Sequence, residues 1–263
     1  NRELYLGNIN MVLLLFCLLS IRAFTTGHTW QGGWWLALSI LAKPYLAILL
    51  LPLILRGRWK ETGITGLGIV TGLLLPFLRT GITGGVELYA SWVETIRIHG
   101  SDFPGMTSLG YLAGRYIPGW PSQGDILPAA AIVAAVSLFI LRNRQSERQS
   151  SRPVPGRTNQ VFEWFLLLGL LPSMIRTDWV LLLFTAPLIM FSIFTVAGMK
   201  ARGWIPVLAI LIFVYGANSD DLLGRELSRQ VLHSGLMGVA NFLLVTVAAI
   251  LFVRYRGLVQ PHP

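Results

Sequence analysis

The chain has 263 residues, of which 54% are hydrophobic and only 13% are charged, whereas a soluble protein carries about 25% charged residues. This composition excludes a soluble enzyme. It fits a bundle of membrane helices, in which Gly, Pro and interfacial Trp are all frequent. The net charge of +9 is concentrated in four basic runs between apolar stretches, at residues 56–60, 142–157, 200–202 and 254–256. Such runs are typical of cytoplasmic loops, so no nucleic-acid partner is predicted.

A helix needs about 20 apolar residues to cross a bilayer, and eight stretches of the chain are candidates. These are residues 4–24, 31–55, 63–78, 126–141, 161–175, 179–197, 204–217 and 231–253. We therefore predict an all-α, polytopic transmembrane bundle with about eight spans. If the chain crosses once in each span from the second onward, the four basic runs are cytoplasmic and the long segment 79–125 is outside. The turn at 176–178 and a polar loop at 218–230 are then outside as well. Simple alternation puts the amino terminus inside, but the orientation of the first span stays open, because Pro44 can split the second helix.

A polar stretch at residues 142–160 is rich in Ser, Pro and Arg and has little to bury. We predict that it is a flexible cytoplasmic linker. It divides the chain into a front membrane half, residues 1–141 with the outer loop 79–125, and a back membrane half, residues 161–263. Because the chain begins with Asn1 and not with Met, we expect that an upstream part of the protein is missing.

Lys43 is the first residue of chemical interest, since an ammonium group inside a membrane costs a few kcal/mol and usually faces a cavity, a partner or an anion. Pro44 frees backbone groups next to it. Together they predict a helix break at which a phosphate could be held. The alternative is that Lys43 extends to the membrane interface or pairs with a carboxylate.

The outer segment predicts an interfacial helix, because Leu88, Trp92, Val93 and Ile96 are spaced to form one apolar face. This helix could form the roof of a cavity that opens outward, or be an ordinary amphipathic connector. Further on, Ser108 and Arg115 are seven residues apart. They would share a face if this piece is helical. Arg115 could hold a phosphate or a sugar carboxylate through its planar guanidinium, or could anchor the chain to lipid headgroups.

Arg176 and Asp178 lie at the outer end of two expected spans. They could neutralise each other, since exposed pairs are common and weak, or they could belong to a site. Asp102 and Asp178, with Glu94, are the outward carboxylates that could act as a base. The chain has a single cysteine and four scattered histidines, so no metal centre is predicted. It also lacks the sequence motifs of nucleotide-binding loops, zinc proteases, serine hydrolases and ion-selectivity filters, which disfavours hydrolysis and ion conduction.

The chain has Gly7-Asn8-Ile9-Asn10 before a leucine-rich span, Lys43-Pro44 in the next span and Arg58-Trp59-Lys60 after it. These three features, in this order, resemble glycosyltransferase family 87. Members of this family are membrane enzymes of the GT-C architecture, typified by polyprenol-phosphate-mannose-dependent mannosyltransferases. They usually show Gly-Gln-x-Asn, a Lys-Pro element and a basic loop at these places. Residues 106–115 and 171–180 are similar to two further family segments.

The chain also departs from the family pattern. Asn8 stands where the family prefers Gln, and Met106 stands where it prefers Asn. The turn at 175–178 lacks the family histidine, and no residue matches the catalytic aspartate of the family's first outer loop. The base would then lie upstream, or be replaced by Asp102 or Asp178.

The resemblance implies a membrane glycosyltransferase in a bacterial plasma membrane that needs no metal or cofactor. It would move a mannose-like hexose from a polyprenyl-phosphate sugar to a lipid or glycan acceptor on the outer face. The substrate-binding residues would be Asn8, Asn10, Lys43, Ser108, Arg115 and Arg176. One alternative is a catalytically degenerate relative that serves as a structural subunit of a larger membrane complex. A permease is a further alternative, which only the helix count and Lys43 support.

Overall fold

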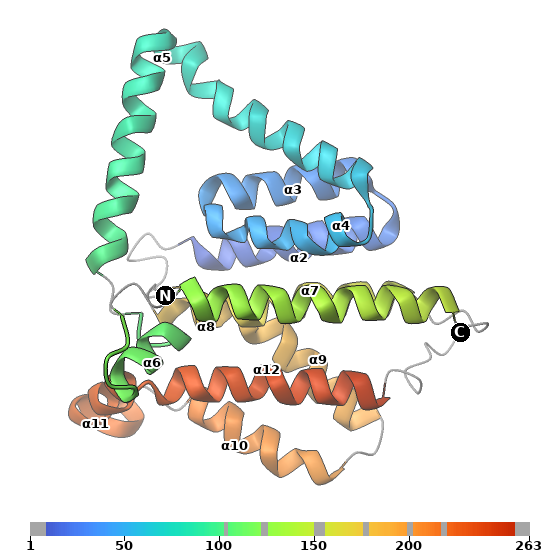
Figure 1. Ribbon diagram of the computed structural model, residues 1–263, viewed down its shortest axis with the longest axis vertical. Helices are drawn as coiled ribbons and strands as arrows, with labels where there is room; N and C mark the ends of the chain where they lie inside the picture. The colour runs from blue at the N-terminus through green and yellow to red at the C-terminus, as the bar shows by residue number, and fades with distance from the viewer. Residues whose placement is uncertain are drawn as a thin grey trace. The chain divides into compact units, whose positions relative to one another are not determined.

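The computed structural model (Figure 1) describes residues 9–102, 105–121, 126–149, 156–175, 179–198, 202–216 and 220–255. Within these ranges the chain is built of helices and turns, with no strand. The all-α prediction is therefore confirmed. The chain divides into two compact units, Asn1–Phe103 and Pro104–Pro263, and each is described by itself. The front and back halves expected on either side of residues 142–160 stay a prediction.

Unit 1 begins with two antiparallel helices, α2 (Asn10–Thr26) and α3 (Thr29–Ala42). Gly27 ends α2 in the left-handed conformation, with φ 86°, which suits a residue without a Cβ. The two helices pack closely, and the buried Ser20 hydroxyl of α2 donates a hydrogen bond of 2.9 Å to the Gly32 carbonyl of α3. The chain then continues through the 3₁₀ helix η1 (Pro44–Leu50) and the short α4 (Leu51–Leu55) into α5 (Trp59–Asp102).

The packing of α3 on α5 shows that the two helices run in the same direction. A Cβ on Gly33 would lie 2.5 Å from Ile64, and one on Gly68 would lie 2.7 Å from the Ala37 Cβ. Both contact pairs move forward along α3 and along α5, so the two helices are parallel. The η1–α4 segment that connects them must therefore run in the opposite direction. Figure 1 shows this return, with α4 beside α3. The expectation of one span over residues 31–55 is thus wrong, since α3 and η1–α4 form an antiparallel hairpin.

Lys43 lies at the turn of this hairpin. Pro44 has no backbone N–H, and its ring disfavours a helical conformation of the preceding residue. Lys43 accordingly adopts an extended conformation, with φ −140° and ψ 99°. At the opposite end of the hairpin, Arg58 Nη2 donates a 3.1 Å hydrogen bond to the Phe24 carbonyl. The predicted helix break is confirmed, but Pro44 reverses the chain there and does not merely bend a continuous helix.

Helix α5 consists of two limbs that meet at Gly81, whose backbone is not helical (φ 69°, ψ −178°). The Tyr89 hydroxyl donates a 2.6 Å hydrogen bond to the Leu73 carbonyl, which joins the two limbs. The rings of Phe77 and Tyr89 lie 5.7 Å apart. The segment expected to form an interfacial helix in the outer loop is therefore helical, and it folds back toward the limb before it (Figure 1).

The described elements of unit 2 are α6 (Leu109–Tyr116), α7 (Ile126–Gln149), α8 (Gly156–Met174), η2 (Trp179–Thr185), α9 (Ala186–Gly198), η3 (Arg202–Trp204), α10 (Ile205–Gly216), α11 (Asp220–Ser234) and α12 (Leu236–Tyr255). Helices α8, α9 and α10 pack against α12. The hydrophobic core of the unit includes Val196, Leu208, Leu211, Ala240, Leu244 and Leu251.

A buried polar cluster joins three elements of unit 2. The Asn241 side chain of α12 donates 2.9 Å hydrogen bonds to the Gly169 carbonyl and the Ser173 hydroxyl of α8. Its oxygen accepts a 2.8 Å hydrogen bond from the Thr185 hydroxyl of η2. Inside a membrane helix, such hydrogen bonds between helices help to fix their register.

Two segments that were expected to be irregular are helical. Helix α7 continues to Gln149 and α8 begins at Gly156, so only residues 150–155 of the expected linker fall outside these helices, and they lie outside the described residues. Polar pairs join the two helix ends, including a 2.6 Å hydrogen bond from Asn159 to Glu147. Residues 220–230 of the expected polar loop belong to α11, which continues to Ser234.

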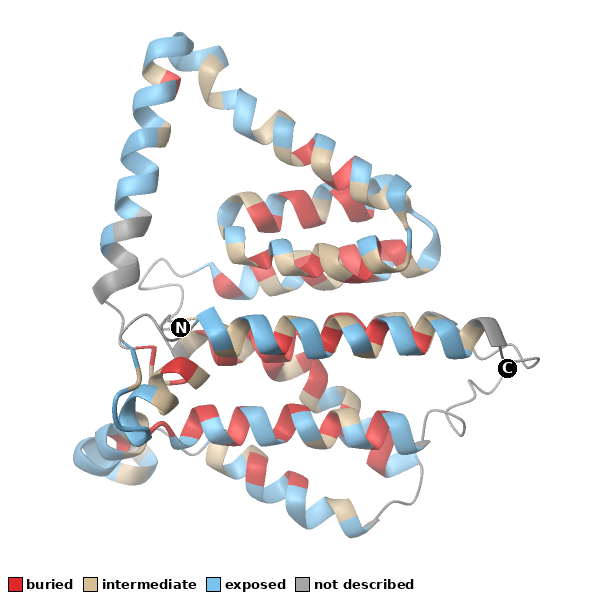
Figure 2. Ribbon diagram, viewed as in Figure 1, coloured by how far each residue is buried: buried red, intermediate tan, exposed pale blue. Residues whose placement is uncertain are grey.

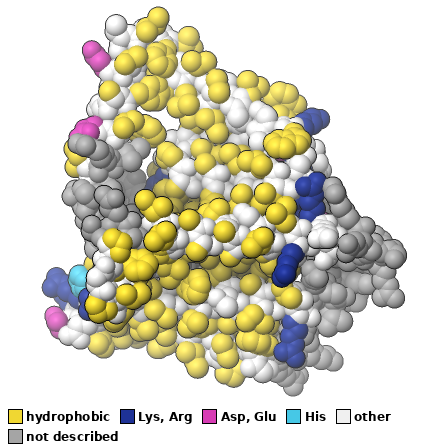
Figure 3. Space-filling model, viewed as in Figure 1, with side chains coloured by type: hydrophobic (Ala, Val, Ile, Leu, Met, Phe, Trp, Pro, Cys, Tyr) yellow, Lys and Arg dark blue, Asp and Glu magenta, His cyan; other side chains and the backbone are white. Residues whose placement is uncertain are grey.

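Four helical segments of the described chain are long and apolar enough to cross a membrane: Trp59–Thr95, Ile126–Glu147, Val180–Gly198 and Leu236–Arg254. Many of their residues are exposed (Figure 2), and in each unit hydrophobic side chains cover most of the visible face (Figure 3). Water does not tolerate apolar faces of this extent, whereas lipid does. The protein is an integral membrane protein. The length and composition of the described helices do not by themselves support the count of eight spans.

Candidate functional site

The structure brings together two of the predicted binding residues at the turn of the hairpin. Lys43 Nζ donates a 2.8 Å hydrogen bond to Asn10 Oδ1, across 33 positions of sequence. Asn10 is 2% exposed, because the first turn of α2 packs against the end of α3. The amide holds the ammonium group in place without neutralising its charge, since asparagine is not ionised.

Tyr45 is the next side chain at this turn, and the sequence analysis did not single it out. Its ring lies 5.8 Å from Lys43 Nζ, which is within the range of a cation–π contact. Its hydroxyl is buried and has no hydrogen-bond partner among the described residues. A tyrosine two residues after an intramembrane lysine, in an otherwise aliphatic segment, is the signal that could have identified it.

An apolar cavity of about 640 Å³ lies between α3 and the two limbs of α5. We call it the Pro44 cavity, because it reaches the residue after Lys43. Its walls are almost entirely hydrophobic. They are formed by Trp34, Ala37, Leu38, Ile40, Leu41, Pro44, Gly68, Ile69, Thr71, Gly72, Leu73, Leu75, Leu88, Tyr89 and Trp92. A volume of this size accommodates a substantial apolar group.

The second limb of α5 supplies three residues to this cavity, Leu88, Tyr89 and Trp92. Two of the four apolar positions predicted for the interfacial helix, Leu88 and Trp92, are therefore among its walls. Of the two readings of this helix, the wall of a cavity fits the structure better than a plain connector. The bend at Gly81 makes this possible, because it folds the second limb back toward the first.

The length of the hairpin indicates how deep Lys43 lies. A return segment of seven 3₁₀ residues and five α-helical residues spans about 21 Å. It begins after Lys43 and ends beside the basic run at 56–60. The hydrocarbon core is about 30 Å thick, so a segment of this length that starts at one membrane surface would carry Lys43 past the midplane.

Ser108 and Arg115 lie in unit 2, on α6. Ser108 is the N-cap of this helix, and its side chain accepts a 3.1 Å hydrogen bond from the Tyr111 amide. Arg115 is exposed, and its guanidinium lies 5.9 Å from the ring of Tyr116. The hydrogen bond with Tyr116 raises the pKa of Arg115 further above its already high value, so this side chain is a permanent cation.

Four predicted site residues cannot be placed. Asn8, Arg176 and Asp178 lie outside the described residues, as does the side chain of Asp102. The structure thus joins Asn10 with Lys43, and it describes Ser108 and Arg115 in the other unit.

A buried carboxylate in unit 2 also escaped the sequence analysis. Glu163 of α8 is fully buried and accepts a 3.4 Å hydrogen bond from the Asn143 side chain of α7. Its signal was a glutamate inside the apolar stretch 161–175. It joins the ends of two helices near a basic run, which favours a role in packing.

These features define a class: an all-helical integral membrane protein with a lysine held by an amide at a hairpin turn and an apolar cavity that reaches the residue after it. The chain belongs to glycosyltransferase family 87, whose family model matches residues 2–157, and the resemblance seen in the sequence is confirmed. It is similar to an alpha-(1->3)-arabinofuranosyltransferase from Corynebacterium glutamicum, with 28% identity over 145 residues. That match covers 55% of this chain and 34% of the relative, so the chain spans about a third of that protein's length. No solved structure matches the chain. The family and the fold together support a membrane glycosyltransferase.

Proposed function

We propose that the protein transfers a sugar from a polyprenyl-phosphate donor to an acceptor on the outer face of the membrane. One observation supports this above the others: Lys43 is held by Asn10, and the next residue, Pro44, lines the apolar Pro44 cavity. A polyprenyl phosphate needs a cation for its phosphate and an apolar wall for its chain. Here the two lie one residue apart in the sequence.

We further propose how unit 1 crosses the membrane. With the basic run at 56–60 in the cytoplasm, Lys43 belongs to the outer leaflet and Asn10 lies near the outer surface. The corrected hairpin adds one pass to the expected count, giving nine among the described residues: α2, α3, η1–α4, the first limb of α5, α7, α8, η2–α9, α10 and α12. The shorter passes require a locally thinned bilayer. The other three basic runs then stay cytoplasmic, as predicted.

The proposed reaction breaks the bond between the sugar's anomeric carbon and the phosphate oxygen. A bond then forms from the acceptor hydroxyl oxygen to the same carbon. Lys43 would stabilise the negative charge that develops on the leaving phosphate. The proton of the acceptor hydroxyl would pass to a carboxylate. Asp102 and Asp178 remain candidates for this base, as does an upstream residue, and Asn8, Ser108, Arg115 and Arg176 remain candidate substrate contacts.

The identity of the sugar has two candidates. The family resemblance implies a mannose-like hexose. The relative's name instead specifies an arabinofuranose, and its similarity to this chain makes that sugar the second candidate. The two sugars differ in ring size, so a transfer assay with both donors shows which of them the protein uses.

The test uses the full-length protein in lipid nanodiscs, with radiolabelled polyprenyl-phosphate mannose and polyprenyl-phosphate arabinofuranose. We expect Lys43→Met to lower the rate of transfer on the order of 10²-fold, as for other losses of a group that stabilises transition-state charge. Lys60→Met is the matched control, because this exposed lysine lies at the other end of the hairpin.

Two outcomes would contradict the proposal. Full activity of Lys43→Met would remove the phosphate role of this lysine. No transfer by the unaltered protein from either donor would favour the degenerate structural subunit that the sequence departures suggest.

A further inference from the structure

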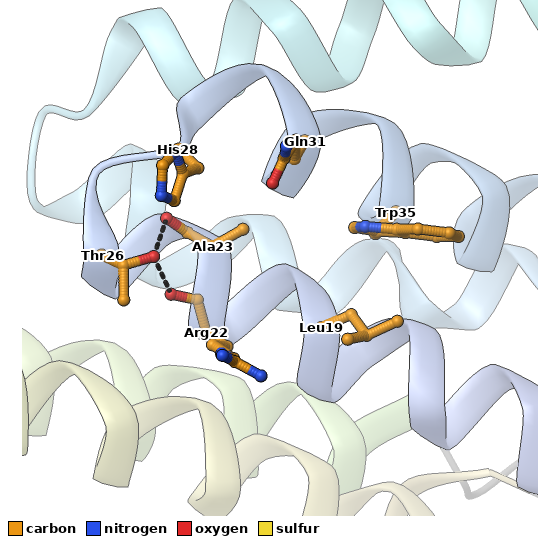
Figure 4. Close-up of a pocket in the computed structure, with 7 residues that line it drawn as sticks. All are labelled: Leu19, Arg22, Ala23, Thr26, His28, Gln31 and Trp35. Carbon is orange, nitrogen blue, oxygen red and sulfur yellow. Dashed lines mark hydrogen bonds between the residues drawn. The ribbon is translucent and has the colours of Figure 1, made fainter.

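A second cavity lies at the opposite end of α2 and α3 from Lys43, and the proposed transfer does not use it. It has a volume of about 330 Å³, within the size range of small-molecule sites. We call it the Arg22 cavity. It lies between the end of α2 and the start of α3 and is lined by Leu19, Arg22, Ala23, Thr26, His28, Gln31 and Trp35 (Figure 4).

The lining residues separate into a polar end and an apolar end. Figure 4 shows Arg22, His28 and Gln31 around one part of the cavity, with Leu19 and Trp35 toward the other. The Trp35 ring also lies 5.0 Å from that of Phe16, one turn before Leu19. The apolar end is thus backed by an aromatic pair between α2 and α3.

The polar end is suited to an anion. Arg22, His28 and Gln31 can all donate hydrogen bonds, and none of the residues that line the cavity is acidic. Among the described residues, no hydrogen bond involves the side chains of these three donors. The Thr26 hydroxyl differs, because it donates to the Arg22 and Ala23 carbonyls at 2.9 and 3.3 Å (Figure 4). It can still accept a hydrogen bond, but not donate one to an anion.

Neighbouring charges leave this end positive. Glu61 is the acidic residue of the adjoining start of α5, and it is bound to Arg58 by hydrogen bonds of 2.7 and 3.1 Å. Arg58 in turn donates to the Phe24 carbonyl, which places the basic run at 56–60 beside the end of α2. The Arg22 cavity is therefore at the end of unit 1 that the charge distribution assigns to the cytoplasm.

We propose that the Arg22 cavity binds the phosphate group of an anionic phospholipid of the inner leaflet. Arg22, His28 and Gln31 would donate to the phosphate oxygens, and the lipid's apolar part would lie against Leu19 and Trp35. A guanidinium is the side chain best matched to phosphate in geometry and charge. The apolar end favours a lipid over free phosphate as the source of the anion.

The test is native mass spectrometry of the full-length protein in detergent, titrated with phosphatidylglycerol and, separately, with phosphatidylcholine. We expect phosphatidylglycerol to bind more tightly. Arg22→Gln should weaken its binding about tenfold or more, since a charge-assisted hydrogen bond is lost. Lys60→Gln, which removes an exposed cation at the same end of the unit but outside the cavity, should leave binding unchanged.

A second variant separates loss of the site from loss of the fold. Arg22→Lys keeps the charge but not the planar geometry and should give intermediate binding. Equal binding by the unaltered protein and by a folded Arg22→Gln protein would overturn the proposal, as would an equal loss in Lys60→Gln. Inorganic phosphate is the third ligand. If it displaced phosphatidylglycerol at comparable concentration, the lipid assignment would be wrong. The readout is lipid binding alone, so its result does not depend on whether the transfer reaction is found.

Discussion

At the scale of single residues, the sequence predicted much about Lys43 and little about its surroundings. A lysine before a proline in an apolar stretch is enough to predict a cation at a helix break. Asn10 entered the prediction only through the family resemblance. Its contact with Lys43 depends on how α2 and α3 pack, which no local pattern contains. The Tyr45 ring beside the same ammonium group was missed although it is only two residues further along the chain.

The Asn10 amide should act on transfer through Lys43. Asn10→Ala removes the 2.8 Å hydrogen bond to Lys43 Nζ, so the ammonium group is less well placed for the donor phosphate. We expect transfer to fall about tenfold, in line with a lost hydrogen bond to a charged group. The measurement is the initial rate of transfer over a range of donor concentrations.

Asn10→Asp and a double variant make this prediction specific. Asn10→Asp places a carboxylate against the ammonium group, which should weaken donor binding more than Asn10→Ala does. In the Lys43→Met protein, Asn10→Ala should add little, because residues that act together are not additive. If Asn10→Ala reduced the rate by the same factor with and without Lys43, the two residues would act separately.

At the scale of elements, glycines decide how α3 and α5 pack. Gly68 and Gly72 are four residues apart on α5 and face Ala37 and Leu41 of α3. Small residues at this spacing allow membrane helices to approach closely. The sequence contains this pattern, yet it does not say which helix is the partner or in which direction that helix runs. This is why the reversal at Lys43 was not predicted: two short apolar helices in tandem look like one long span.

Gly68→Val should destabilise unit 1 more than Gly66→Val. The added Cβ at Gly68 would lie 2.7 Å from the Ala37 Cβ, whereas nothing lies within 4 Å of one at Gly66. Overpacking of this kind costs about 1–3 kcal/mol, and both variants carry the same change in helix propensity. We expect a midpoint of thermal unfolding several degrees lower for Gly68→Val, measured in detergent by static light scattering. Equal midpoints for the two variants would show that α3 does not pack on this face of α5.

At the scale of the whole molecule, composition and charge distribution predicted the class of protein correctly. Few charged residues and basic runs between apolar stretches require a polytopic membrane protein. Composition and charge do not determine the number of passes, because it depends on where the chain turns inside lipid. Both limbs of the hairpin are shorter than an ordinary span, and the turn between them is the single residue Lys43, which leaves little polar sequence to detect.

The hairpin makes a topological prediction that differs from that of a single span. If residues 31–55 crossed once, Thr26 and Lys60 would lie on opposite sides of the membrane. In the hairpin both lie at the same end, as the contact of Arg58 with the Phe24 carbonyl requires. Thr26→Cys and Lys60→Cys, each made in a protein with Cys17→Ala, should both react with a membrane-impermeant thiol reagent only from the cytoplasm. Both positions are exposed.

Two further cysteines calibrate this labelling. Ser150→Cys should react from the cytoplasm, since it lies within the basic run at 142–157. Thr83→Cys, just past the bend at Gly81, should react from outside. With these references, labelling of Thr26→Cys from outside and Lys60→Cys from inside would restore the single span and return Lys43 to the middle of the membrane. The proposed donor site would then lose its outer-leaflet position, because the phosphate of a lipid donor lies near the membrane surface and a cation at the midplane could not reach it.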